Sequence, residues 1–73
     1  MNASNLPEEN ESFSGMTVNE RLVVAGSIDQ FDAAARGRDR QAMIALLLAV
    51  QLDDQQAAHT TDSILSNPRQ YGY

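Results

Sequence analysis

The chain has 73 residues, enough for one small domain whose hydrophobic core is close to the lower size limit for independent folding. The chain contains no cysteine, so it cannot form disulfide bonds, and with a single histidine it has too few ligands for a structural metal. Its ten acidic residues and five arginines give a net charge of −5, and so few cations argue against nucleic acid as a partner.

Residues 1–15 are predicted to form a disordered acidic arm. They contain three glutamates and no cation, and their only large apolar residues after the initial methionine are Leu6 and Phe13. Such a segment cannot bury enough apolar surface to fold alone. It also lacks the basic start and apolar stretch of a secretory signal, so we expect a cytoplasmic protein with a single domain over residues 16–73.

A first helix is predicted from Thr17 to about Arg36. Thr17 and Glu20 have the spacing of a capping box, which satisfies the first free backbone N–H groups of a helix. Gly26 lies in the middle of this helix and indicates a close approach of another backbone. The stripe expected to face the bundle consists of Val24, Ile28, Phe31 and Ala35. A second, shorter stripe consists of Val18, Leu22 and Ala25.

Gly37 and Asp39 predict a tight turn before the second helix. Glycine suits the left-handed residue that ends a helix, and aspartate suits the N-cap of the next helix. Because a short connection makes two helices antiparallel neighbours, we expect an αα-hairpin here.

The second helix, over about residues 40–51, contains nine consecutive apolar residues. A membrane-spanning helix needs roughly 20, so we expect a core segment and no contact with a membrane. The residues divide round the helix axis into three groups. These are a core-facing group (Met43, Leu46, Leu47, Val50), a separate edge (Ile44, Leu48) and a small-residue side suited to close helix packing (Ala45, Ala49).

The third helix is predicted to begin at Asp53 and to end near Ser66. Asp53 and Gln56 have capping-box spacing, and Pro68 disfavours helical conformation at the residue before it. The apolar stripe of this helix consists of Ala57, Ala58, Thr61, Ile64 and Leu65. The predicted fold is therefore all-α, a small three-helix bundle made of an antiparallel helical hairpin and a third helix. We expect Tyr71 or Tyr73 to cover the apolar end of this bundle, or alternatively to lie across a partner subunit.

The sequence predicts no enzyme and no cofactor. His59, Asp62 and Ser63 are residue types found in catalytic triads, but their spacing places them on one solvated helix face without a pocket. The paired acidic residues Asp53 and Asp54 suit a helix N-terminus better than a metal site. No glycine-rich phosphate loop occurs, and no small-molecule substrate is indicated.

Arg36, Arg38 and Arg40 form the one basic cluster, at the predicted turn between the first two helices. They could hold an anion or the carboxylates of a partner through bidentate contacts. Their aspartate neighbours favour surface ion pairs and favourable charges at a helix C-terminus instead.

The excess of apolar residues predicts protein–protein association. Three helices leave part of the apolar surface uncovered, and the expected interface consists of Val18, Leu22, Ala25, Ile44 and Leu48. The most direct partner is a second copy of the chain in a twofold homodimer. The alternatives are a small inhibitor of phage or antitoxin type that binds a larger protein, and an accessory subunit of an enzyme. Arginine-only cations and abundant alanine indicate a GC-rich genome, and we expect an interaction protein of bacterial or phage type.

Overall fold

The computed structural model describes Phe13 and residues 15–73, and these residues form α-helices and one 3-10 helix without any strand. The elements in chain order are α2 (Val18–Val24), α3 (Ile28–Arg36), α4 (Arg40–Ala49), α5 (Asp54–Ser66) and the 3-10 helix η1 (Pro68–Tyr71). The all-α prediction is confirmed. The disordered arm predicted for residues 1–15 lies outside the described residues, apart from Phe13 and Gly15.

The predicted helix starts are confirmed by hydrogen bonds. In the capping box of α2, Glu20 N donates to Thr17 Oγ1 at 3.1 Å and Thr17 N donates to Glu20 Oε1 at 2.9 Å. Asp53 and Gln56 form the same reciprocal pair before α5, at 2.7 and 3.2 Å. Asp39 caps α4 by accepting from the backbone N–H of Ala42.

The single helix predicted over residues 17–36 is wrong, because the chain breaks between α2 and α3. Gly26 has a φ of +74°, in the left-handed region that glycine adopts without a steric penalty. A Cβ atom added at Gly26 would meet nothing within 4 Å, so no neighbouring backbone explains this glycine. The described residues thus form four α-helices instead of three.

Helices α2, α3 and α4 end in the same way, with a Schellman motif. In each motif, one backbone N–H donates to the carbonyl oxygen five residues earlier, and the N–H before it donates to the carbonyl oxygen three residues earlier. At the end of α2 these bonds are Ser27 N to Leu22 O at 2.9 Å and Gly26 N to Val23 O at 3.0 Å. The left-handed residues are Gly26, Arg38 (φ 57°) and Gln51 (φ 78°). The prediction that Gly37 takes the left-handed conformation is therefore wrong: its φ is −81°, and Arg38 one residue later turns the chain.

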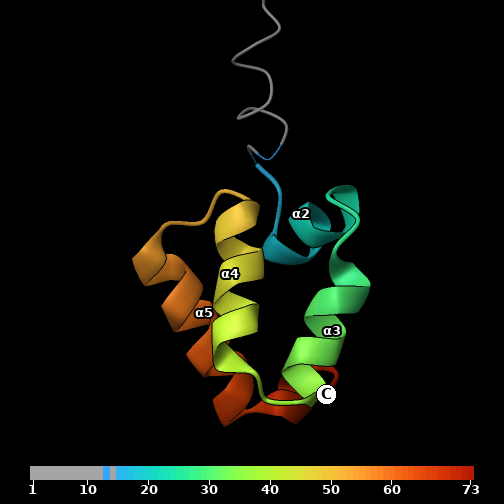
Figure 1. The fold of residues 1–73 in the computed structure, drawn as a ribbon, viewed down its shortest axis with the longest axis vertical. Helices are drawn as coiled ribbons and strands as arrows, with labels where there is room; N and C mark the ends of the chain where they lie inside the picture. Colours follow the sequence, from blue (N-terminus) through green and yellow to red (C-terminus); the bar gives the residue numbers. More distant parts are fainter. Residues whose placement is uncertain (1–12, 14) are drawn as a thin grey trace, which may run out of the picture.

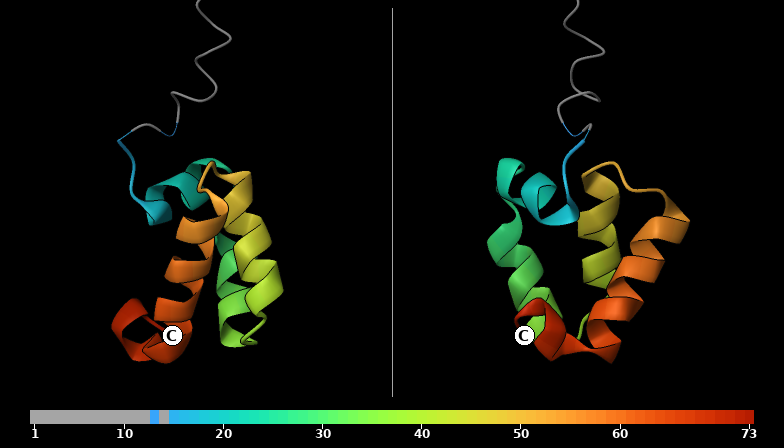
Figure 2. Two further views of the ribbon diagram at one scale, coloured as in Figure 1. Left: turned by 90° about the vertical axis from the view of Figure 1, so that its left-hand side faces the viewer. Right: turned by 180° about the vertical axis from the view of Figure 1, so that it is seen from behind.

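Helix α4 is the central element of the fold. It runs antiparallel to both α3 and α5, and the α3–α4 pair is the predicted αα-hairpin (Figure 1). Helix α2 crosses the end of this layer near the C-terminus of α4, while η1 closes the opposite end (Figure 2). Because the chain turns back after α5, η1 brings the C-terminus next to α3, where the Tyr73 hydroxyl bonds to Asp32.

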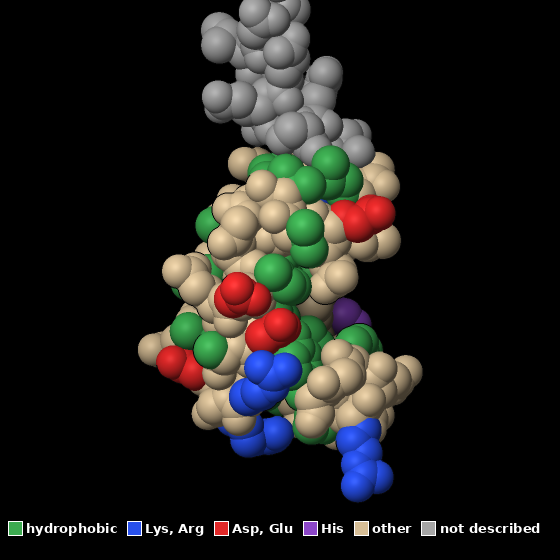
Figure 3. All heavy atoms as spheres, turned by 90° about the vertical axis from the view of Figure 1, so that its right-hand side faces the viewer, with side chains coloured by type: hydrophobic (Ala, Val, Ile, Leu, Met, Phe, Trp, Pro, Cys, Tyr) green, Lys and Arg blue, Asp and Glu red, His purple; other side chains and the backbone are tan. Residues whose placement is uncertain are grey.

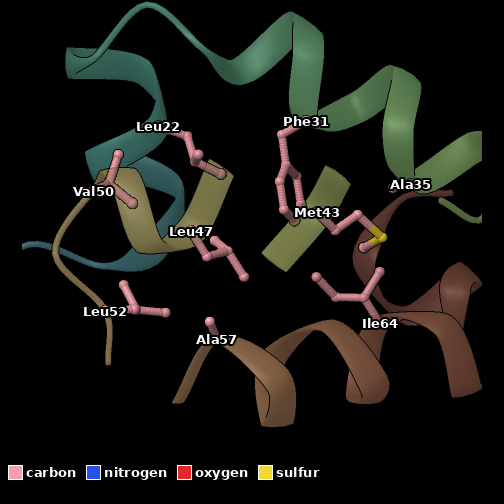
Figure 4. Packing of buried hydrophobic residues seen from close by; sticks show 9 residues of the cluster. All are labelled: Leu22, Phe31, Ala35, Met43, Leu47, Val50, Leu52, Ala57 and Ile64. Carbon is pink, nitrogen blue, oxygen red and sulfur yellow. The ribbon is translucent and has the colours of Figure 1, made fainter. Parts of the chain in front are cut away.

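The core lies between these helices, and each of the four α-helices contributes buried side chains to it (Figure 4). Its apolar members are Leu22, Phe31, Ala35, Met43, Leu47, Val50, Leu52, Ala57 and Ile64. Met43, Leu47 and Val50 confirm three of the four residues in the core-facing group predicted for the second helix, and the fourth, Leu46, is half-buried and packs against the core. Ala45 and Ala49, predicted to lie at a close helix contact, are instead exposed. Among the described residues, no helix is long and apolar enough to cross a membrane.

Candidate functional site

The residues of the predicted interface occupy three different environments. Leu22 is 1% exposed and belongs to the core of the chain. Val18 and Ile44 are half-buried and pack against that core. Ala25 and Leu48 lie on the surface, with Leu48 39% exposed. Of the five residues in the predicted interface, only Leu48 and Ala25 are therefore exposed and accessible to a partner.

Two valines of α2 add an exposed apolar surface that the sequence pattern did not predict. Val23 and Val24 are 56% and 57% exposed, the highest values among the large exposed apolar residues of the described chain. Together with Met16, they line a shallow surface hollow of about 300 Å³. Val24 was predicted to face the core, and that prediction is wrong because the break at Gly26 removes the helical register between Val24 and Ile28.

The three arginines of the basic cluster do not converge on one anion site. Arg40 makes a bidentate ion pair with Asp62 of α5, with Nε and Nη2 at 2.8 and 3.2 Å from the carboxylate oxygens. Arg38 Nη2 donates to the Leu65 carbonyl oxygen in the last turn of α5, at 3.0 Å. These contacts tie the α3–α4 turn to α5 and satisfy a free carbonyl group near the end of that helix.

Arg36, the third member, lies over the ring of Tyr73 with its guanidinium carbon 5.7 Å from the ring centroid. On the face of the molecule shown in Figure 3, the arginine side chains gather at one end, and some of them lie close to acidic side chains. The cluster is thus occupied by contacts within the chain.

Arg21 plays a corresponding role at the other end of the molecule. Its Nη1 donates to the Val50 carbonyl oxygen at 3.1 Å, where α4 has ended, and its Nε donates to Met16 O at 3.3 Å. The guanidinium carbon also lies 6.0 Å from the centroid of the Phe13 ring. One side chain therefore joins α2, the segment that precedes it and the C-terminal end of α4.

The C-terminal segment packs on its own chain, as the first of the two alternatives predicted. The Tyr73 hydroxyl donates a hydrogen bond to Asp32 Oδ1 of α3, and its ring contacts the core. Tyr71 remains 47% exposed. Burial, the hydrogen bond to Asp32 and the charge of that carboxylate together raise the pKa of Tyr73 from 10.0 to about 12.

This pKa shift predicts a loss of stability at high pH. Between pH 10 and pH 12, Tyr73 loses its proton in the unfolded chain before it does so in the folded chain, so rising pH favours unfolding. Because the side chain is only partly buried, we expect the loss to be about 1 kcal/mol. Urea unfolding followed by circular dichroism across this range measures it. Tyr73→Phe should lack this component, and an unchanged pH dependence in the variant would contradict the assignment.

His59, Asp62 and Ser63 are not joined by hydrogen bonds among the described side chains. Asp62 is held by Arg40, and their hydrogen bond is the main reason why the pKa of Asp62 lies below its ordinary value. The expectation that this face has no pocket is wrong, however. His59 and Ser63 line two adjoining hollows, one toward α2 and α3 and the other toward Asn67 and Gln70.

The first of these hollows is a groove of about 360 Å³ between α2, α3, α5 and η1, which we call the aromatic groove. Leu22, Phe31 and Ile64 form its apolar floor, and Tyr71 at the end of η1 and Tyr73 two residues later line it. His59, Thr60, Ser63 and Asn19 supply polar atoms. None of the lining residues comes from α4. The sequence contained no signal for this groove, because its residues lie on four elements that come together only through the fold.

Within the described part of the chain, no three His, Asp or Glu side chains are grouped so that they could hold a metal ion. Comparison with protein-family models, with curated proteins and with solved structures finds no significant match to this chain.

Proposed function

We propose that this chain is a non-enzymatic protein–protein interaction module that associates with a second copy of itself. The observation that carries the proposal is the exposure of three large aliphatic side chains, Val23, Val24 and Leu48. A domain of this size buries a limited fraction of its surface, so removing such side chains from water in a dimer would add to its stability.

Leu48 is the centre of the proposed contact. It lies on the exposed side of α4 beside Ala45 and Ala49, whose small side chains would let a partner helix approach closely. Val24 is the last residue of α2 and Ala25 is its C-cap, and α2 crosses near the C-terminal end of α4. A twofold axis near this end would place the same apolar surface of both copies in contact.

The proposal that the chain is not an enzyme rests on the contacts of His59, Asp62 and Ser63, the residue types found in catalytic triads. Asp62, which would have to orient His59, is engaged by Arg40 in a bidentate pair. A triad needs that carboxylate to hold the imidazole next to the nucleophile. The arrangement of α5 and α4 therefore supports a structural role for Asp62.

Sedimentation or light scattering at increasing concentration tests the dimer directly. We expect the mass to rise from that of the 8.0 kDa chain to twice that value, and Leu48→Asp to shift the equilibrium toward the monomer at least about tenfold. Gln55→Asp, an exposed substitution on α5 that leaves the apolar surface intact, is the matched control and should retain the dimer.

A monomer at every concentration would overturn the homodimer. In that case the proposed partner of the surface around Leu48 is a different protein. The chain would then act as a small inhibitor of that protein or as an accessory subunit of an enzyme. Stoichiometric capture of one protein from the native host, lost in Leu48→Asp and retained in Gln55→Asp, would identify that case. Deletion of residues 1–12 in the same experiment tests whether the acidic segment contributes to binding.

A further inference from the structure

We propose that the aromatic groove binds a small uncharged molecule that has an aromatic or alicyclic ring and a hydroxyl or amide group. Three aromatic side chains line the groove: Tyr71 at the end of η1, Tyr73 two residues later, and Phe31 from α3. Its volume of about 360 Å³ lies within the range of small-molecule sites, and such sites occur between the helices of bundles.

The lining sets the chemistry of the ligand. The floor is apolar, whereas Asn19, Thr60 and Ser63 supply hydrogen-bonding groups at its edges, together with the imidazole of His59. Among the described residues, no Asp, Glu or Arg lines the groove. A ligand with a formal charge would therefore lose hydration without gaining an ionic partner, while an uncharged ring with one polar group satisfies both parts of the lining.

The groove is also formed before any ligand arrives. Leu22 and Phe31 are 1% and 2% exposed, so core packing fixes the floor. The hydrogen bond from Tyr73 to Asp32 and the contact between Tyr73 and Arg36 hold the η1 side in place. Binding would require little ordering of the protein, which favours affinity for a small ligand.

Titration of the full chain with benzamide, followed by two-dimensional NMR of the backbone amides, tests this inference. Benzoate and benzylammonium carry the same ring with a negative and a positive charge and are the matched probes. We expect saturable shifts from benzamide at groove residues such as Thr60, Ser63 and Tyr71, and affinities at least about tenfold lower for the charged probes. The absence of saturation, or equal binding of all three probes, would overturn the proposal.

A pair of variants locates the site. Ser63→Trp fills the groove from α5 and should abolish the benzamide shifts, whereas Gln55→Trp places the same side chain on α5 away from the groove and should retain them. Intermolecular nuclear Overhauser effects between benzamide and Phe31 or Ile64 in the unmodified chain provide a test that does not depend on the folding of a variant. Contacts at Val23 and Val24 in place of the groove would contradict it. Because none of the residues of the proposed dimer contact, Val23, Val24, Ala25 and Leu48, lines the groove, failure of the dimer leaves this result unaffected.

Discussion

Leu47→Ala should destabilise the folded chain by about 2–5 kcal/mol, the cost of leaving a cavity in a packed core. Leu47 is 0% exposed and lies at the centre of the core, between the helices that flank α4. A domain of 73 residues has a total stability of only about 4–11 kcal/mol. The substitution should therefore remove a large part of the stability or unfold the chain. Urea unfolding monitored by circular dichroism measures the change.

The neighbouring residue supplies the control. Leu48→Ala removes the same atoms from the next position of α4, where the side chain is 39% exposed, and should cost about 1 kcal/mol or less. Measurement at a concentration below that of any association keeps the comparison to the single chain. Equal losses for Leu47→Ala and Leu48→Ala would mean that α4 is rotated relative to the arrangement described above.

Thr61→Val should stabilise the fold by about 1–3 kcal/mol, the cost of burying a hydroxyl group without a hydrogen bond. Thr61 is 0% exposed, and its Oγ1 has no hydrogen-bond partner among the residues that the structure describes. Valine has nearly the same shape and the same branching at Cβ, so the packing of α5 against α4 should be retained. The midpoint of urea unfolding should rise while its slope stays constant.

Thr60→Val is the control for this substitution. Thr60 precedes Thr61 on the same helix but is only half-buried, so water can satisfy its hydroxyl, and valine there should change the stability by no more than about 0.5 kcal/mol. A loss of stability in Thr61→Val would show that the hydroxyl donates to a backbone carbonyl group one turn earlier in α5.

Local signals predicted the helix starts well. The capping boxes at Thr17 and Asp53 depend on side chains three residues apart, and both form as expected. The core-facing residues of α4 also followed from their spacing, because only one side of that helix faces both α3 and α5. These features are set by residues close together in the chain, and a sequence contains that information directly.

The break between α2 and α3 was missed because the apolar spacing from Val24 to Ala35 continues across Gly26 as if the helix did. The interface prediction depended on that continuous helix, so Leu22 was expected outside the core and Val24 inside it. The aromatic groove could not be predicted from the sequence for another reason. Its walls come from segments more than 40 residues apart, and only tertiary packing brings Asn19 near Tyr71.

The Schellman motifs also define how relatives of this chain should be recognised. At the ends of α2, α3 and α4, the left-handed residues are at positions 26, 38 and 51, about a dozen residues apart. Glycine or asparagine adopts this conformation with the least strain. We expect this spacing to be kept even where surface and core side chains are substituted. Moving one left-handed residue along the sequence would rotate the next helix and turn its apolar side away from the core. Distant homologues should therefore keep a left-handed residue at each of these three helix ends, with Gly or Asn favoured there, and Ser, Thr or Asp within the next two residues, after overall identity has disappeared.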